Sequence, residues 1–197
     1  MKFKLFGTEI YISFLFAAVI TILLATDRTG LIMPSIFAII MHELGHLFAM
    51  WILGCGPKRI RLIPSSVQIT SSFSRKYKND IIIAISGPIV NFVLFFTFLI
   101  NYKAYSNESV LYFCIINLII ALFNSLPIFG LDGGTVLFII LAKRYNPNKA
   151  AVILKFITLI VAVFVLLIAV TLTINHRINI SLYIMAIYFL IGALIKM

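Results

Sequence analysis

The stretch IIMHELGHLF, residues 39–48, places two histidines and a glutamate inside a long apolar run. Ionisable side chains are costly at membrane depth, and those found there usually have a function. The meaning of this stretch therefore depends on whether the rest of the chain enters a membrane.

The composition favours a membrane protein. Hydrophobic residues make up 62% of the 197 residues, charged residues make up 11%, and the mean hydropathy is +1.14. Too few polar groups are present to cover a surface that faces water. The chain is therefore expected to be an integral membrane protein, whose length is best divided by the roughly 20 residues that one membrane-spanning helix needs.

Apolar runs of that length predict an all-α polytopic fold with about six transmembrane helices. The six expected spans are residues 10–26, 31–53, 81–100, 110–126, 156–174 and 180–195. Apolar sequence continues from the fourth span through Pro127 and Gly130 to Ala142. Because proline and glycine interrupt helices, the fourth span is predicted to kink or break between Pro127 and Gly134.

The distribution of basic residues predicts the orientation. With the N-terminus inside, 13 of the 16 Lys and Arg residues fall on the cytoplasmic side, and only Arg28, Lys103 and Arg177 fall outside. Short cytoplasmic loops carry the excess of positive charge, so both termini are expected in the cytoplasm. The net charge of +10 then indicates topology and contact with anionic lipid, and no nucleic-acid partner is expected.

The polar segment 54–80 follows the second span. Apolar and polar residues alternate from Val67 to Phe73, which predicts a short β-strand or a re-entrant segment. Cys55 and Cys114 fall in different regions, so a disulfide between them is not expected.

The motif HELGH has the spacing of a helical metal site. Residues four apart share one helix face, so His42 and His46 can bind one metal ion through their imidazoles. Glu43 lies about 100° further around the helix, where it can act on a water molecule without being a ligand. This arrangement is typical of zinc peptidases, although iron or cobalt could bind the same ligand types.

Asp132 is the candidate for a third ligand. It is the one acidic residue inside apolar sequence besides Glu43, within NSLPIFGLDGG, residues 124–134. His46 precedes the cytoplasmic Lys58 by 12 residues, and Asp132 precedes the cytoplasmic Lys143 by 11. Helical rise places both at about 16 to 18 Å from the cytoplasmic charges, so they are expected at one depth.

Three motifs in this order resemble the site-2 protease family of intramembrane zinc metalloproteases, peptidase family M50. They are HELGH, then SGPIVN at residues 86–91, then NSLPIFGLDGG. The resemblance covers residues 31–142, the expected three-helix catalytic core, with additional spans at 10–26, 156–174 and 180–195. Six spans are similar to the branch that processes a sporulation sigma factor.

The resemblance implies roles for particular residues. It implies His42, His46 and Asp132 as ligands of one zinc ion and Glu43 as the catalytic carboxylate. Asn124 and Pro127 would shape the substrate groove, and Gly87, Pro88 and Asn91 would pack or polarise near the site. On the sequence alone, Gly87 and Pro88 predict a turn at the start of a helix. Asn91 predicts a hydrogen bond between helices.

The expected reaction is hydrolysis of a peptide bond in or near a transmembrane segment of a membrane protein. A substrate helix must unwind before attack, and an enzyme strand can then pair with its backbone. Val67 and Ile69 are the candidates for that strand. Possible substrates are an anti-sigma or a pro-sigma factor, and a membrane regulatory partner is possible.

Other classes stay open. A non-catalytic membrane metal-binding or transport protein, or a pseudoprotease, would need the ligands but no base at Glu43. A prenyl-protein type of peptidase takes its third ligand from a glutamate-rich motif, which this sequence lacks. The location expected is a bacterial cell membrane, with sporulation as one setting. Residues 1–197 are expected to form a single membrane-embedded peptidase domain with no CBS or PDZ domain.

Overall fold

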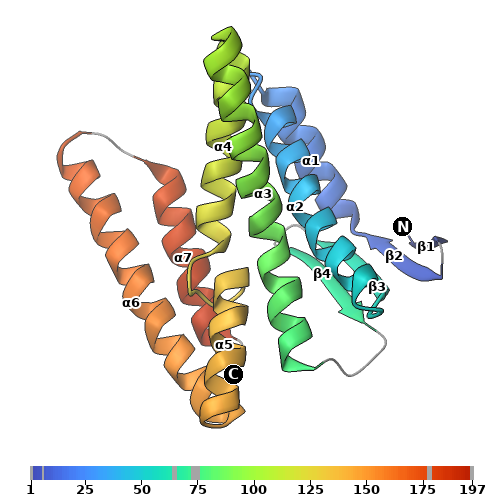
Figure 1. Cartoon of the computed structure of the whole chain (residues 1–197). Coiled ribbons are helices and arrows are strands. Elements are labelled where there is room, and N and C mark those ends of the chain that lie inside the picture. Colours follow the sequence, from blue (N-terminus) through green and yellow to red (C-terminus); the bar gives the residue numbers. More distant parts are fainter. Residues whose placement is uncertain (1, 6, 64–65, 72–75, 177–178, 196–197) are drawn as a thin grey trace. The chain divides into compact units, whose positions relative to one another are not determined.

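The computed structural model describes residues 2–5, 7–63, 66–71, 76–176 and 179–195. In this part of the chain it has four strands and seven helices (Figure 1). The chain divides into two compact units, Met1–Leu122 and Phe123–Met197. Each unit is described by itself below.

The first unit contains four apolar helices. They are α1 (Phe14–Thr26), α2 (Ile32–Ile52), α3 (Tyr77–Tyr105) and α4 (Glu108–Asn124), whose last two residues belong to the second unit. Helices α2 and α3 pack closely because Gly45 has no side chain. A Cβ at Gly45 would lie 2.8 Å from the Ser86 carbonyl oxygen and 2.9 Å from Val90. Close backbone approach at small residues is a common way to pack membrane helices.

A four-stranded sheet completes the first unit. The strands β1 (Lys2–Leu5), β2 (Thr8–Ile12), β3 (Pro57–Ile63) and β4 (Ser66–Ser71) lie in this order. β1 pairs antiparallel with β2, β2 parallel with β3, and β3 antiparallel with β4. The predicted strand after the second span is confirmed as β4 over residues 66–71, whereas residues 72 and 73 lie outside the described part.

The prediction that the first span begins at residue 10 is wrong. Residues 10–12 belong to β2, and α1 begins only at Phe14. Ile10 and Ile12 are apolar like the helix that follows, but they pair with Ile60 and Leu62 of β3. The Ser13 backbone N–H continues this pairing by donating to the Leu62 carbonyl at 3.0 Å.

The second unit contains α5 (Asp132–Arg144), α6 (Pro147–Ile174) and α7 (Ile180–Ile195). Its core includes Ile128, Leu131, Ala162 and Phe189. The predicted break of the fourth span is confirmed, since α4 ends at Asn124 and α5 begins at Asp132. Gly130 lies in the connecting turn with φ of 92°, a conformation that glycine adopts without strain.

The helices are apolar on the outside. Within the described residues, α2, α3 and α6 are long and apolar enough to cross a membrane, and α1, α4 and α7 are shorter apolar helices. On α6, Ile160 is 67% exposed and Phe164 is 62% exposed. Such surfaces are unfavourable in water and suit the hydrocarbon of a bilayer. The six helices correspond to the six expected spans of a polytopic membrane protein.

Candidate functional site

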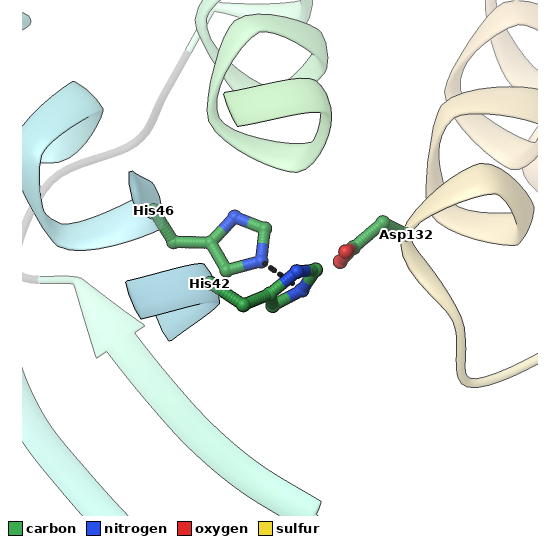
Figure 2. Close-up of side chains that lie close together, drawn as sticks. All are labelled: His42, His46 and Asp132. Carbon is green, nitrogen blue, oxygen red and sulfur yellow. Dashed lines mark hydrogen bonds between the residues drawn. The ribbon is translucent and has the colours of Figure 1, made fainter. Parts of the chain in front are cut away.

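His42 and His46 project from successive turns of one face of α2. Both imidazoles are buried, with 4% and 8% of the residue exposed. Their ring centroids are 4.8 Å apart at an interplanar angle of 84°. Figure 2 shows the two Nε2 atoms turned toward each other, and they lie 3.2 Å apart.

The hydrogen bonds of the other ring nitrogens determine where each imidazole carries its proton. His42 Nδ1 lies 2.8 Å from Asn91 Oδ1, and His46 Nδ1 lies 2.7 Å from the Ile83 carbonyl oxygen. Both partners are acceptors, so Nδ1 is the protonated nitrogen in each neutral ring. Each Nε2 therefore carries a lone pair.

Two lone pairs at 3.2 Å repel each other unless a cation lies between them. A metal ion that accepts imidazole nitrogen removes this repulsion, and ligating histidines typically donate their other N–H to a carbonyl or carboxylate. The ring tautomers and the orientation of both nitrogens thus fit a metal such as zinc.

Asn91 orients the first of these rings. It is fully buried on α3, and its Nδ2 donates to the Ala38 carbonyl at 3.1 Å and to Asn117 Oδ1 at 2.8 Å. Because the amide nitrogen has two acceptors, Oδ1 must be the atom that faces His42. The predicted interhelical hydrogen bond of Asn91 is confirmed, and it joins α2, α3 and α4.

Sequence reasoning missed Asn117. It is fully buried on α4, and its Nδ2 donates to the Phe113 carbonyl at 2.8 Å. Its Oδ1 accepts a hydrogen bond from Asn91 Nδ2. Asn117 thus orients the amide of Asn91, which in turn orients the ring of His42. An asparagine in the middle of an apolar run is a signal that could have found it.

Gly87 leaves room beside the two Nε2 atoms. A Cβ at this position would overlap the His46 Nε2 and would lie 2.8 Å from the His42 Nε2. Glycine thus keeps the space in front of both nitrogens open. The expectation that Gly87 and Pro88 form a turn at the start of a helix is wrong, because Pro88 lies inside α3, which begins at Tyr77.

Glu43 follows His42 directly on α2 and is partly buried. Consecutive helical residues differ by about 100° around the axis, so its carboxylate belongs to a neighbouring face. This placement agrees with a group that acts beside the histidines.

Asp132 is the first residue of α5 in the second unit, and Figure 2 shows its carboxylate projecting from that end of the helix. The turn before it folds tightly onto α5. A Cβ at Gly133 would overlap the Ser125 carbonyl, and a Cβ at Gly134 would overlap that of Ile128. Gly133 and Gly134 thus permit the close packing of the turn, which determines the position of the Asp132 side chain.

Two further candidates border the same turn. Asn124 is the last residue of α4 and is partly buried, and Pro127 is exposed between the helices. Val67 and Ile69 lie on β4, at one edge of the sheet.

A family model described as Peptidase M50B-like matches residues 15–179. The chain belongs to this peptidase family. The match covers α1 from its second residue through the end of α6 and stops just before α7, and it confirms the resemblance to site-2 proteases. Within this M50B-like chain, HELGH lies in the middle of α2, and LDGG lies at the start of α5.

Named relatives of this M50B-like chain include two curated proteins. A zinc metalloprotease of Methanocaldococcus jannaschii is 30% identical over 182 residues, which are 84% of this chain and 53% of that protein. Stage IV sporulation protein FB of Bacillus subtilis is 28% identical over 131 residues, which are 64% of this chain and 46% of that protein. The chain thus spans about half the length of the curated relatives it matches.

The fold of this M50B-like chain is also similar to a solved structure. The site-2 protease from Methanocaldococcus jannaschii superposes with a TM-score of 0.72 at 27% identity. The similarity covers 98% of this chain and 93% of that one. It therefore extends over both compact units.

Proposed function

We propose that the protein is an intramembrane zinc metalloprotease that hydrolyses a peptide bond in or near a transmembrane segment of its substrate. The observation that carries the proposal is the pair of Nε2 atoms that face each other at 3.2 Å on an apolar helix, next to Glu43. Membership of the M50B-like peptidase family supports the same reaction.

His42, His46 and Asp132 would hold the zinc ion. They offer two imidazole nitrogens and one carboxylate oxygen, a ligand set that leaves a fourth position open in a catalytic zinc site. Asp132 comes from the second unit, and its role is supported by the likeness to the site-2 protease, which extends over both units. Asn91 would fix the ring of His42 in the ligating orientation.

Zinc, when bound, polarises the scissile carbonyl and lowers the pKa of water toward 7. The carboxylate of Glu43 takes a proton from the attacking water and delivers it to the leaving amine. Asn124 and Pro127, at the turn before Asp132, would line the groove that receives the unwound substrate. Gly87 keeps the region in front of the ligands free of side chains.

Removal of the metal tests this proposal. The purified protein in lipid vesicles is expected to cleave members of a panel of single-span membrane proteins that includes a pro-sigma factor. Treatment with 1,10-phenanthroline should abolish cleavage, and about one equivalent of zinc should restore it, because the metal supplies the polarisation. Cleavage that continues in metal-free protein would contradict the proposal.

β4 would bind the substrate backbone. It pairs only with β3 in the described sheet, so its other edge is available to an additional strand. Such pairing would offset the hydrogen bonds that a substrate helix loses when it unwinds. Val67 and Ile69 lie within this strand.

Ile69→Pro tests the role of β4. Proline removes a backbone donor and is poorly tolerated within strands, so cleavage should fall by about tenfold or more. Zinc content should stay unchanged, since no proposed ligand is altered, and Ile69→Val should cleave like the unaltered protein. Unchanged cleavage by Ile69→Pro would remove β4 from substrate binding.

The location, orientation and partners of the protein follow from the same proposal. The chain would act as one peptidase domain in a bacterial cell membrane with both termini in the cytoplasm. Similarity to a sporulation protein of Bacillus subtilis supports a pro-sigma or anti-sigma factor as substrate and a membrane partner as regulator.

A further inference from the structure

One face of the sheet carries a cluster of cations. Lys2 of β1 pairs with Tyr11 of β2, which pairs with Arg61 of β3, and Lys4 pairs with Glu9, which pairs with Arg59. Side chains alternate along a strand, and directly paired residues share a face. These six side chains therefore lie on one face, which we call the cationic face.

The charges on the cationic face do not cancel. Arg59 and Glu9 form a salt bridge of 2.8 Å, and the hydrogen bond and charge of Arg59 hold the pKa of Glu9 below its ordinary value. Glu9 is thus ionised at neutral pH and offsets one of four cations, which leaves an excess of three. Lys2 lies 5.9 Å from the centre of the Tyr11 ring.

The cationic face surrounds an open hollow of about 840 Å³. Phe3 and Ile10 complete its lining, together with the six residues of the face. Lys2, Lys4, Arg59 and Arg61 are all exposed, so their charged groups are accessible to a ligand. A hollow with an excess of positive charge suits an anionic group such as a phosphate.

The sheet is joined directly to the apolar helices. β2 ends at Ile12 and α1 begins at Phe14, whose side chain is 87% exposed. Tyr11 is three residues before Phe14, which is about 10 Å along a strand. The cationic face thus begins about one Debye length from the first lipid-facing side chain.

Exposed aromatic residues mark the same level on the neighbouring helices. Trp51 is 74% exposed in the last turn of α2, shortly before β3, and Tyr77 is 54% exposed at the first residue of α3. Tryptophan and tyrosine are enriched where the bilayer meets water. The strands between these helices accordingly lie at the level of the lipid headgroups.

We propose that the cationic face binds the phosphate headgroups of anionic phospholipids. Lys2, Lys4 and Arg61 supply the excess charge, and the direct connection to α1 keeps them at the bilayer surface. An acidic protein segment would match the charge equally, but the position of the face beside the spans favours lipid. The site would hold the sheet that contains β4 at the surface of the bilayer.

Trp51 allows a direct test, because it is the single tryptophan of the chain and lies near β3. The full chain is placed in vesicles that contain a trace of either dansyl-phosphatidylglycerol or dansyl-phosphatidylcholine, and energy transfer from Trp51 is compared. We expect the anionic probe to be enriched near Trp51 by about fivefold or more relative to the zwitterionic probe. In the triple variant Lys2→Gln, Lys4→Gln, Arg61→Gln, energy transfer from Trp51 to the anionic probe should fall until it nearly equals transfer to the zwitterionic probe.

Two control variants separate charge from folding. Lys2→Arg, Lys4→Arg, Arg61→Lys keeps the charges and should keep the enrichment. Arg28→Gln with Lys103→Gln removes one cation that follows α1 and one in the last turn of α3, and should also keep the enrichment. Equal transfer for both probes in the unaltered protein would overturn the proposal, as would enrichment that survives the triple glutamine variant. Tight binding of a poly-glutamate peptide without lipid enrichment would assign the face to an acidic protein segment instead and would also overturn it.

Discussion

Glu43→Gln is expected to abolish cleavage of membrane substrates while leaving the zinc content unchanged. Glutamine has the size of glutamate but cannot accept a proton, so the general base is lost. The two imidazoles and their acceptors, Asn91 and the Ile83 carbonyl, are untouched. Loss of a general base typically lowers the rate about 10²- to 10⁴-fold.

The measurement combines zinc analysis of the purified variant with single-turnover cleavage in vesicles. Glu108→Gln is a matched control, because Glu108 is an exposed glutamate in the first turn of α4. It should cleave and bind zinc like the unaltered protein. Full cleavage by Glu43→Gln would exclude this residue as the base. Zinc binding without any cleavage by the unaltered protein would favour the non-catalytic metal-binding class.

Gly87→Ala is expected to cause an equally large loss, but through the metal. The new methyl group would overlap His46 Nε2 and would lie 2.8 Å from His42 Nε2. Neither ring can move away without losing its Nδ1 hydrogen bond, and α3 cannot retreat without opening the contact at Gly45. We expect zinc affinity to fall at least about 100-fold, the upper end of losses for residues that support metal ligands.

Competition with a chelator measures this affinity, and cleavage should fall in parallel. Gly192→Ala on α7 is a matched control, because the Cβ that it would add meets no atom within 4 Å among the described residues beyond the adjacent backbone of its own helix. It should keep zinc and activity. If Gly87→Ala bound zinc as tightly as the unaltered protein, the Nε2 atoms would not be the metal-binding atoms, whatever the fate of cleavage.

Local sequence patterns predicted much of the helical architecture. Each of the six apolar runs corresponds to one helix. Such helices are predictable because the length and composition of a segment decide whether it can span a membrane. The break after Asn124 was predicted from Pro127 and the glycines, whose backbone preferences act locally. The HELGH motif could be interpreted for the same reason, since residues four apart on one helix must be neighbours.

Features that depend on distant pairing were not predictable in the same way. The apolar residues Ile10 and Ile12 look like the start of a span, and only their pairing with β3, 50 residues later, makes them a strand. Pro88 looks like a helix start, yet α3 continues through it. The role of Asn117 depends on its hydrogen bond with Asn91, which lies on another helix.

Three hydrogen bonds that link His42 to α3 and α4 run in one direction. Asn117 donates to the Phe113 carbonyl, Asn91 donates to Asn117, and His42 donates to Asn91, each at 2.8 Å. In such a chain every donated proton makes the next oxygen a stronger acceptor, so polarisation accumulates toward the imidazole. At His46 the acceptor is a backbone carbonyl, that of Ile83, which also accepts from the Ser86 hydroxyl at 2.6 Å. The ring of His42 is thus linked to an amide on α4, whereas the ring of His46 is linked to the backbone of α3.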